Sequence, residues 1–349
     1  MFKFRNIFRI VSGSSTLFAL AVFTGCRFRP LEDPEYNTRL NVRVNTDAIS
    51  NVTCDIYNPK LKIQEIAPVA MHVLFYDVKS NAVAAESFIS EVSADTDGTR
   101  VLSGNLQLSP GHYRMLVYDF GTDAVKVQDY SSWNTAEAVT DPVPSSVKNV
   151  FGVKADGSGA VDIREQPEHL VVARNSDEHV PYHEGVYTIE TEAETVVESY
   201  YLQIKVDGLE YVSSAQAVLT GMVGSNLISS GRWVSEPPVA VWFRLEKSDD
   251  GGVPVICTVF NTFGRIDSSG NSLEVTFDIK TKTGDSVRRT FDISDLFLSE
   301  NSMKHHWLLL DETIKIDPPV RRRWLLPEAG RLGRGTQGTG IMKITIKIL

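Results

Sequence analysis

Histidine and cysteine side chains carry most of the chemistry that this chain could perform. Its 349 residues include seven His and three Cys. His179 and His183 are four residues apart, a spacing that on a helix would place two zinc ligands on one face. Pro181 lies between them and excludes a regular helix. Together with Glu184 they could form a metal site in a loop, but we favour a polar loop between two domains.

His305 and His306 are adjacent, so a strand would point their rings to opposite faces. The chain contains no G-x-S-x-G, no H-E-x-x-H and no phosphate-binding glycine loop. Residues 267–271 (DSSGN) superficially resemble a calcium loop but lack its spaced carboxylates and final Glu. We therefore expect no catalytic residues, no metal site and no cofactor, and we expect that the protein is not an enzyme.

Two of the cysteines, Cys54 and Cys257, lie in strand-like runs. They could form one disulfide, yet neither has a metal-ligand or redox spacing. Free Cys is among the most buried residue types, so we favour two buried free thiols.

The third cysteine ends a stretch with the layout of a secretory signal. Cationic residues within the first nine positions precede an apolar run from Leu17 to Phe23, which is too short to span a bilayer. Thr24 and Gly25 then lead to Cys26. This ending resembles the lipobox of bacterial lipoproteins, apart from Phe23 where Leu is usual.

The lipobox resemblance implies that residues 1–25 are a signal peptide and that the mature chain begins at Cys26. In that family the thiol is diacylated and the new amino group is acylated too, with palmitate among the acyl chains. Three chains exceed the two-signal threshold for stable membrane attachment. The protein is thus expected to be anchored to a membrane without spanning it. The alternative is an exported soluble protein with an incidental Cys26.

The charge of the mature body bears on its partners. From Cys26 to Pro319 the chain has 25 Lys and Arg against 43 Asp and Glu, a net charge of −18. A surface this acidic repels nucleic acid and anionic lipid. We expect no nucleic-acid partner, and membrane attachment must come from the acyl chains.

Alternation and turn residues indicate strands in the first half. Residues 40–45 alternate apolar and polar side chains, as a half-buried strand does. Residues 68–78 form an apolar run, and residues 83–89 could be the second arm of a hairpin with it. A proline-glycine turn at 109–111 leads into a further strand. Residues 121–160 are rich in turn residues, so we expect loops and one short helix there.

The second half has the longest β-rich stretch, residues 186–206, and one face of the strand predicted there is exposed to solvent. Residues 215–222 could form a strand or a short helix. The turn Thr283-Gly284-Asp285 joins the arms of the clearest hairpin. Further strands are expected at 239–245, 255–263, 273–279, 287–291 and 307–316.

No segment shows sustained helical periodicity, and turn signals recur roughly every 8 to 12 residues. This pattern is typical of all-β proteins and favours antiparallel β-sandwiches. A mature chain of about 320 residues exceeds one ordinary core, so we predict two sandwiches in tandem. We place a lipidated tether at 26–35, an N-terminal β-sandwich at 36–165 and a C-terminal β-sandwich at 166–318.

Several motifs resemble those of the FimB/Mfa-type fimbrial anchor lipoproteins of Bacteroides relatives. After the lipobox and tether they are FYD at 75–77, LSPGHYR at 108–114, VDGL at 206–209, VLTG at 218–221, FNTFG at 260–264 and TFDIS at 290–294. They are turns and strands, and none is catalytic. The resemblance implies two transthyretin-like β-sandwich domains and a cell-surface adhesion role at the base of a fimbrium, where the lipidated subunit fixes the fibre to the outer membrane.

The resemblance also implies pilin subunits as partners and strand addition as the mode of binding, in which one subunit supplies an extended segment to its neighbour's groove. We expect that groove in the second domain, because its strands are the better formed. The rival interpretation is a surface lipoprotein that binds glycan or peptide through an aromatic groove. Trp233, Trp242 and Trp307 are its candidate residues, although core or domain-interface packing is the more ordinary role of buried Trp.

Residues 319–349 differ abruptly from the body. From Arg321 onward there are seven Lys and Arg against one Glu. One interpretation is a basic arm that docks on anionic headgroups, with residues 341–349 alternating like a strand that could be donated to a neighbour. The other, which we favour, is a frameshift in the gene, because the same nucleotides read one base later can encode a glycine-rich and then acidic tail. The codons of the gene decide between them.

Overall fold

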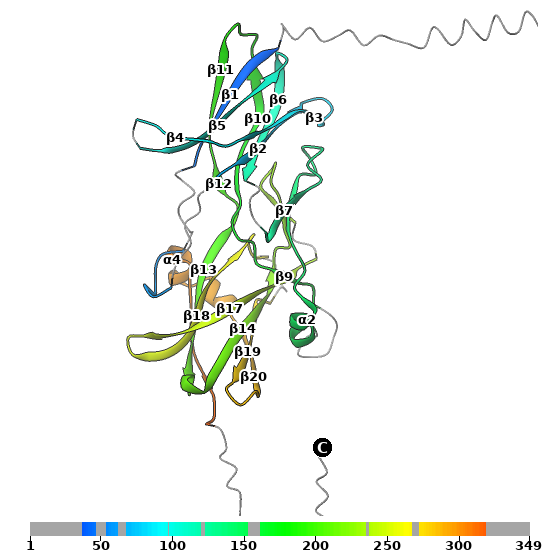
Figure 1. Ribbon diagram of the computed structural model, residues 1–349. Helices are drawn as coiled ribbons and strands as arrows, with labels where there is room; N and C mark the ends of the chain where they lie inside the picture. Colours follow the sequence, from blue (N-terminus) through cyan, green and yellow to red (C-terminus); the bar gives the residue numbers. More distant parts are fainter. Residues whose placement is uncertain are drawn as a thin grey trace, which may run out of the picture.

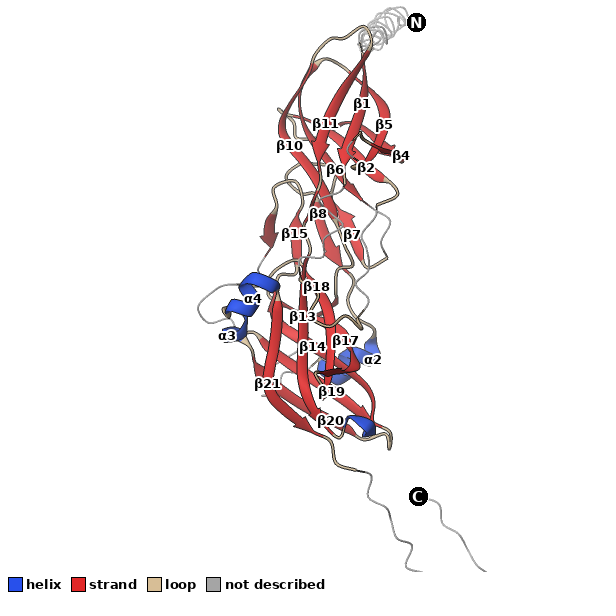
Figure 2. Ribbon diagram, turned by 90° about the vertical axis from the view of Figure 1, so that its left-hand side faces the viewer, coloured by secondary structure: helices blue, strands red, loops and turns tan. Residues whose placement is uncertain are grey.

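The computed structural model describes residues 37–46, 54–61, 68–96, 98–119, 123–152, 161–234, 237–266 and 272–318. The expected signal peptide, Cys26, the tether at 26–35, the turn at 267–271 and the tail at 319–349 lie outside these residues. The described chain consists mainly of strands in four sheets, which confirms the all-β class. Figures 1 and 2 show an elongated molecule, with the N-terminal sheets at one end and the largest sheet at the other.

Two sheets pack face to face at the N-terminal end. Their strands are β1 (Thr38–Asn45), β2 (Met71–Asp77), β3 (Val83–Ile89), β4 (Glu91–Ala94), β5 (Arg100–Leu108), β6 (Gly111–Asp119), β10 (Val171–Val180), β11 (Val186–Glu192) and β12 (Glu194–Thr195). The first sheet has the order β11-β1-β5-β4 and the second β12-β10-β6-β2-β3. The alternation expected at 40–45 builds the core between them, since Leu40, Val42 and Val44 are fully buried there.

A third, small sheet covers the other face of the second sheet. Its strands are β7 (Val125–Gln128), β8 (Glu137–Thr140), β15 (Ser225–Leu227) and β16 (Arg232–Val234), in the order β16-β15-β8-β7. Leu74 and Tyr76 of β2 belong to the core shared with this sheet, whereas Val73 and Phe75 belong to the core shared with the first sheet. The apolar run at 68–78 is explained, because a strand buried on both faces does not alternate.

The expectation of loops at 121–160 is wrong for β7 and β8. Each has only four residues, too few for a period of two to stand out from the turn residues around it. The short helix expected in this stretch is present as α2 (Ser145–Phe151), which buries Val147 and Phe151.

One large sheet forms the C-terminal end. Its strands are β9 (Ile163–Glu165), β13 (Glu198–Asp207), β14 (Val212–Met222), β17 (Val239–Asp250), β18 (Val253–Thr262), β19 (Glu274–Thr281), β20 (Ser286–Asp292) and β21 (Trp307–Lys315). The order is β20-β19-β14-β17-β18-β13-β21, with β9 beside β17. The first half of β17 pairs with β14 and its second half with β18. All seven strands in this order contribute side chains to one hydrophobic core.

Short helices join some of these strands. The 3-10 helix η3 (Leu209–Tyr211) follows β13, and α3 (Ser294–Phe297) and α4 (Glu300–His305) connect β20 to β21. The β19–β20 hairpin expected around Gly284 is confirmed, and Gly284 has the positive φ of 93° that this turn requires. Residues 215–222 lie in a strand, β14, and the final strand lies where it was expected.

Three strand pairs depart from the purely antiparallel arrangement that we expected. The pairs β1–β11, β13–β21 and β9–β17 are parallel. Parallel neighbours need long crossover connections, and in each pair the two strands are separated by many residues and by other strands. Turn spacing reports only local hairpins, so it could not reveal these pairings.

The strand pairing also departs from a division at residue 166. Strands β10 and β11 follow that residue but pair with β6 and β1 of the N-terminal sheets. The β-rich stretch 186–206 is split, because β11 belongs to the N-terminal end and β13 to the C-terminal sheet. The composition shift near Gln166 therefore marks the loop before β10. The chain crosses between the two ends more than once, because β9 lies in the C-terminal sheet and β10 to β12 lie at the N-terminal end.

An ion pair between a half-buried histidine and a buried carboxylate joins the segment before β10 to the end of β6, and it makes stability depend on pH. Asp119 is 3% exposed; its Oδ1 accepts a hydrogen bond from the backbone N–H of Val171 at 2.7 Å, and its Oδ2 lies 3.2 Å from His169 Nε2. The hydrogen bond with Asp119 raises the pKa of His169 above its ordinary value, although burial opposes the rise. A raised folded-state pKa stabilises the fold at pH values below the unfolded pKa of about 6.5, and this stabilisation is lost as pH rises through the folded pKa.

The variant His169→Gln, which cannot carry a charge, is therefore expected to lose more stability at pH 5.5 than at pH 8.5. Urea denaturation of the parent and the variant at both pH values measures the two differences in unfolding free energy. The difference between parent and variant is taken at each pH, so the contributions of other titrating groups to the unfolding free energy cancel. One such group is His72, whose pKa is lowered by burial. A difference that does not change with pH would contradict the assigned ion pair.

Candidate assembly interface

The two edge strands of the C-terminal sheet are the strongest candidates for contact with another protein chain. Within the described residues, β20 pairs only with β19, and β21 pairs only with β13. An edge strand presents unpaired backbone N–H and C=O groups, which can pair with an added strand. Both edges belong to the sheet in which we expected a groove.

Partly covered apolar side chains lie along one margin of the C-terminal core. The residues that pack against this core without being fully buried are Leu209, Tyr211, Val287, Phe291 and Leu296. Val287 and Phe291 lie on the edge strand β20, whose other residues are exposed. An added strand beside β20 would therefore meet both open backbone groups and apolar side chains.

The outer face of β20 is occupied at one point. The Arg288 guanidinium donates a hydrogen bond to the carbonyl of Val150 and lies 5.5 Å from the ring centroid of Phe151. Helix α2 is thus fastened to β20 from the side opposite the core. This contact leaves Val287 and Phe291, which face the core, uninvolved.

The other edge strand, β21, carries an irregularity. Its parallel register with β13 shifts between Ile204 and Lys205, so that Asp311 and Glu312 have no partner residue on β13. Both residues are exposed, and Lys205 Nζ lies 3.5 Å from Asp311 Oδ1. Bulges and charges are the usual means by which an edge strand is protected against pairing. Strand β20 also carries exposed charges, at Arg288, Arg289 and Asp292, but its register with β19 has no shift. Strand β20 is therefore the more regular of the two edges.

Residues 54–61, which we call the strap, follow β1 in the chain yet lie on the C-terminal sheet. Tyr57 donates its hydroxyl hydrogen to Asp250 Oδ2 at 2.8 Å, and Asn58 Nδ2 donates to Ser248 Oγ at 2.8 Å. At its start, Asp55 accepts a hydrogen bond from Trp307 Nε1 at 2.9 Å through its carbonyl. The strap thus ties the chain segment between β1 and β2 to β17 and β21.

Aromatic rings and a thiol lie beneath the strap. The Tyr57 ring stacks on Tyr201 with centroids 4.8 Å apart and meets Trp307 edge-on at 5.0 Å. Cys257 is fully buried in the same cluster, 3.9 Å from Asn58 Nδ2. Cys54 is also buried, and neither cysteine is in a disulfide, which confirms the expected free thiols. Burial raises the pKa of the Cys54 thiol to about 11 and also raises the pKa of the Cys257 thiol.

The buried thiol can report whether the strap is in place. In a chain carrying Cys26→Ser and Cys54→Ser, Cys257 should react very slowly with a thiol reagent, because it is buried and protonated. Ring contacts are worth about 0.5–1.5 kcal/mol each, so adding Tyr57→Ala should make labelling roughly tenfold faster. Tyr182→Ala, at a 55% exposed Tyr between β10 and β11, is the matched control and should change nothing. Equal labelling rates in both variants would show that the strap does not cover Cys257.

The three tryptophans considered for an aromatic groove do not come together. Trp242 packs beside α2 and its Nε1 donates to Gln216 Oε1, Trp307 packs under the strap, and Trp233 lies on β16 against Gly264. They belong to different parts of the molecule, so they do not line one glycan or peptide groove.

The histidines that were considered in pairs from the sequence, His179 with His183 and His305 with His306, each contact different residues. His179 faces His112 across β10 and β6, with ring centroids 4.8 Å apart, whereas His183 Nδ1 accepts a hydrogen bond from the Gly185 backbone N–H. His305 stacks on Trp307, and His306 stacks on Tyr200. Sequence reasoning paired His179 with the wrong residue, because the true neighbour lies on a strand 67 positions earlier.

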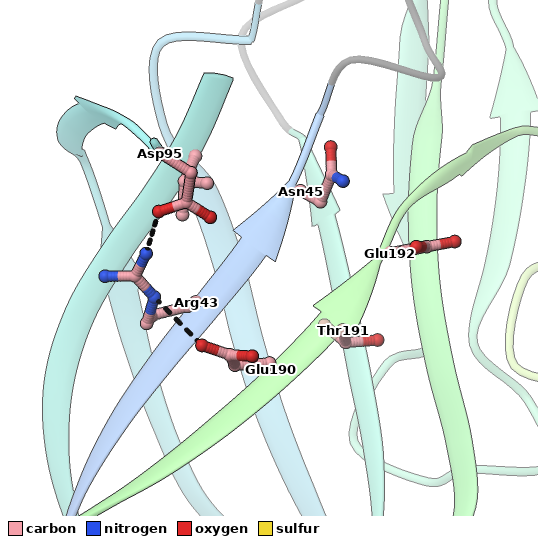
Figure 3. A pocket seen from close by; sticks show the side chains of 7 residues that line it. Arg43, Asn45, Asp95, Glu190, Thr191 and Glu192 are labelled. Atoms are coloured by element: carbon pink, nitrogen blue, oxygen red, sulfur yellow. Dashed lines mark hydrogen bonds and ion pairs between the residues drawn. The ribbon is translucent and has the colours of Figure 1, made fainter. Parts of the chain in front are cut away.

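A shallow pocket lies over the parallel pair β1–β11 at the other end of the molecule. Figure 3 shows Arg43 between Asp95 and Glu190, and Glu192 and Asn45 farther along the same two strands. Arg43 forms an ion pair with Asp95 and a second one, at 3.5 Å, with Glu190. Asp95 and Glu190 are exposed and Arg43 is half-buried, and ion pairs at the surface contribute little to stability. We assign this pocket no chemistry.

A family model described as "Domain of unknown function (DUF5119)" matches residues 52–243. The chain belongs to this family. The match begins just before the strap and ends within β17, so the DUF5119 region includes strands from both ends of the molecule.

A curated relative and solved structures are similar to this DUF5119 chain. The "Putative fimbrium anchoring subunit Fim4B" of Bacteroides ovatus is 22% identical over 236 residues, which are 67% of this chain and 60% of that protein. A structure described as a "putative adhesin" from Bacteroides ovatus has a TM-score of 0.57 and 19% identity, and the match covers 84% of this chain and 98% of the other. The fimbrial anchor protein Mfa2 from Porphyromonas gingivalis has a TM-score of 0.44 and 14% identity, with 80% and 90% covered. The expected resemblance to fimbrial anchor proteins is confirmed.

Proposed function

We propose that this protein is a lipid-anchored cell-surface subunit that holds the base of a fimbrium to the outer membrane. Acyl chains on Cys26 attach one end to the membrane, and the C-terminal sheet binds a fibre subunit by strand addition. The protein is a structural component and has no enzymatic role. The similarity to a protein described as a fimbrium anchoring subunit supports the proposal, although this chain spans about 60% of that relative's length.

The observation that carries the proposal is the edge of β20 beside a partly covered core. Backbone groups on an edge strand supply the hydrogen bonds for an added strand, and pockets for alternate side chains supply specificity. Val287 and Phe291 are four residues apart on the core-facing side of β20, with Arg289 between them, so they can contact residues of an added strand that are also four positions apart. The strap lies on β17 and β21, which leaves β20 accessible.

A peptide titration tests strand addition at this edge. Synthetic peptides covering the terminal segments of the fibre subunit that co-purifies with this chain are added to the Cys26→Ser chain. The correct peptide is expected to raise the melting temperature in proportion to the logarithm of its concentration, because it binds only the folded state. Phe291→Lys should abolish the shift, since it places a charge where the added strand packs.

Thr290→Lys is the matched control, because it places the same charge on the opposite face of the same strand, where Thr290 Oγ1 bonds Thr276 Oγ1 at 2.9 Å. It should leave the shift intact. If saturating peptide leaves the melting temperature unchanged, or if both Lys variants respond alike, strand addition at β20 is wrong.

A further inference from the structure

His112 and His179 lie side by side on the outer face of the second sheet. They are directly opposite each other in the antiparallel pair of β6 and β10, and both are exposed. Directly opposite residues have Cβ atoms about 4.5–5.5 Å apart, so their side chains can reach one shared ligand. The ring centroids are 4.8 Å apart with the planes tilted by 47°.

A β-bulge next to this pair places a carboxylate behind one of the rings. The register of β10 with β6 shifts between Asn175 and Glu178, which adds one residue to β10. Bulges of this kind re-aim side chains. Asp177 lies within the bulge, and its Oδ1 is 3.1 Å from His112 Nδ1. When Nδ1–H of His112 donates to this carboxylate, the lone pair of Nε2 is left available.

We propose that His112 and His179 form a binding site for one divalent transition-metal ion of the zinc and copper class. Each supplies one imidazole nitrogen, and Asp177 orients His112, in the way that carboxylates commonly fix the tautomer of a metal-ligating His. Imidazole suits zinc and copper, whereas magnesium and calcium prefer oxygen ligands.

The number of protein ligands follows from the surroundings. Within the described part of the chain, no three His, Cys, Asp or Glu side chains are grouped so that they could hold a metal together. The protein therefore contributes two nitrogen ligands, and water completes the coordination. Such a site is open and exchanges its metal readily, and it links β6 to β10 beyond the bulge.

Calorimetric titration of the metal-free, full chain carrying Cys26→Ser with Zn²⁺ tests the site. One Zn²⁺ ion should bind per chain, and His112→Ala or His179→Ala should each weaken binding at least tenfold. Asp177→Asn should weaken it about 10- to 100-fold, the usual cost of losing an outer-shell partner. His183→Ala is the matched control, because His183 follows β10 and its Nδ1 is already hydrogen-bonded to Gly185. This variant should bind like the parent, and Mg²⁺ and Ca²⁺ should give no binding.

Cu²⁺ supplies a second readout through paramagnetic broadening in NMR spectra. The imidazole resonances of His112 and His179 should broaden at lower Cu²⁺ concentrations than those of the other five histidines. Circular dichroism confirms that each surface variant is folded. The inference is overturned if the parent binds no Zn²⁺, if the His112→Ala, His179→Ala double variant binds it like the parent, or if His183→Ala is the variant that loses binding.

Discussion

Replacing Cys26 with Ser is expected to move the protein from the membrane fraction to the soluble fraction. The lipobox hypothesis makes the acyl chains on Cys26 the anchor, and each buried CH₂ group of such a chain contributes about 0.8 kcal/mol to membrane binding. In the part of the chain that the structure describes, no helix has the length and apolar character needed to cross a membrane. Cell fractionation and immunoblotting, with high-salt and carbonate washes of the pellet, measure the redistribution.

Cys54→Ser is the control for this experiment, because Cys54 is a buried thiol in the folded body. That variant should remain in the membrane fraction. If Cys26→Ser stays in the pellet through both washes, the lipoprotein hypothesis is wrong.

Phe260→Ala is expected to destabilise the C-terminal sheet severely. Phe260 is fully buried, stacks on Phe243 with centroids 4.6 Å apart and planes inclined by 14°, and lies 5.9 Å from the Tyr200 ring. Removing a buried Phe ring costs about 3–5 kcal/mol, compared with a total stability of about 5–15 kcal/mol for a typical domain. Urea denaturation followed by circular dichroism measures the change in unfolding free energy.

Tyr182→Ala also removes an aromatic ring, but from a 55% exposed position outside this core. Surface changes of this type usually alter stability by less than about 0.5 kcal/mol. A Phe260→Ala variant as stable as Tyr182→Ala would contradict the packing described for β18 and β17. The edge at β20 depends on this core, so the Phe260 variant should also lose the peptide response.

Local patterns predicted the strands that form hairpins. The β19–β20 arms, the β2–β3 pair and the turn before β6 are joined by a few residues, so turn chemistry and alternation locate them together. Even the continuous apolar run that became β2 was informative, because a strand covered on both faces needs no polar side.

Long-range pairing could not be predicted in this way. No local sequence pattern shows that β11 lies parallel to β1, or that β15 pairs with β8. The second pairing places a strand from the second half of the chain beside the N-terminal sheets. The strap was missed for the same reason, since Tyr57 and Asn58 contact residues about 190 positions later. His112 follows the proline-glycine turn, and its partnership with His179 depends on the register of two distant strands.

The fate of the fibres in cells that carry Cys26→Ser tests the central claim most directly. If this protein fastens a fimbrium to the outer membrane, immunogold electron microscopy should find the fibres released into the medium, with the protein at one end of each fibre. Cells with the unaltered protein should retain their fibres, with the protein at the cell-proximal end. Fibres that stay on the Cys26→Ser cells, or released fibres that carry none of the protein, would contradict the proposed anchoring function.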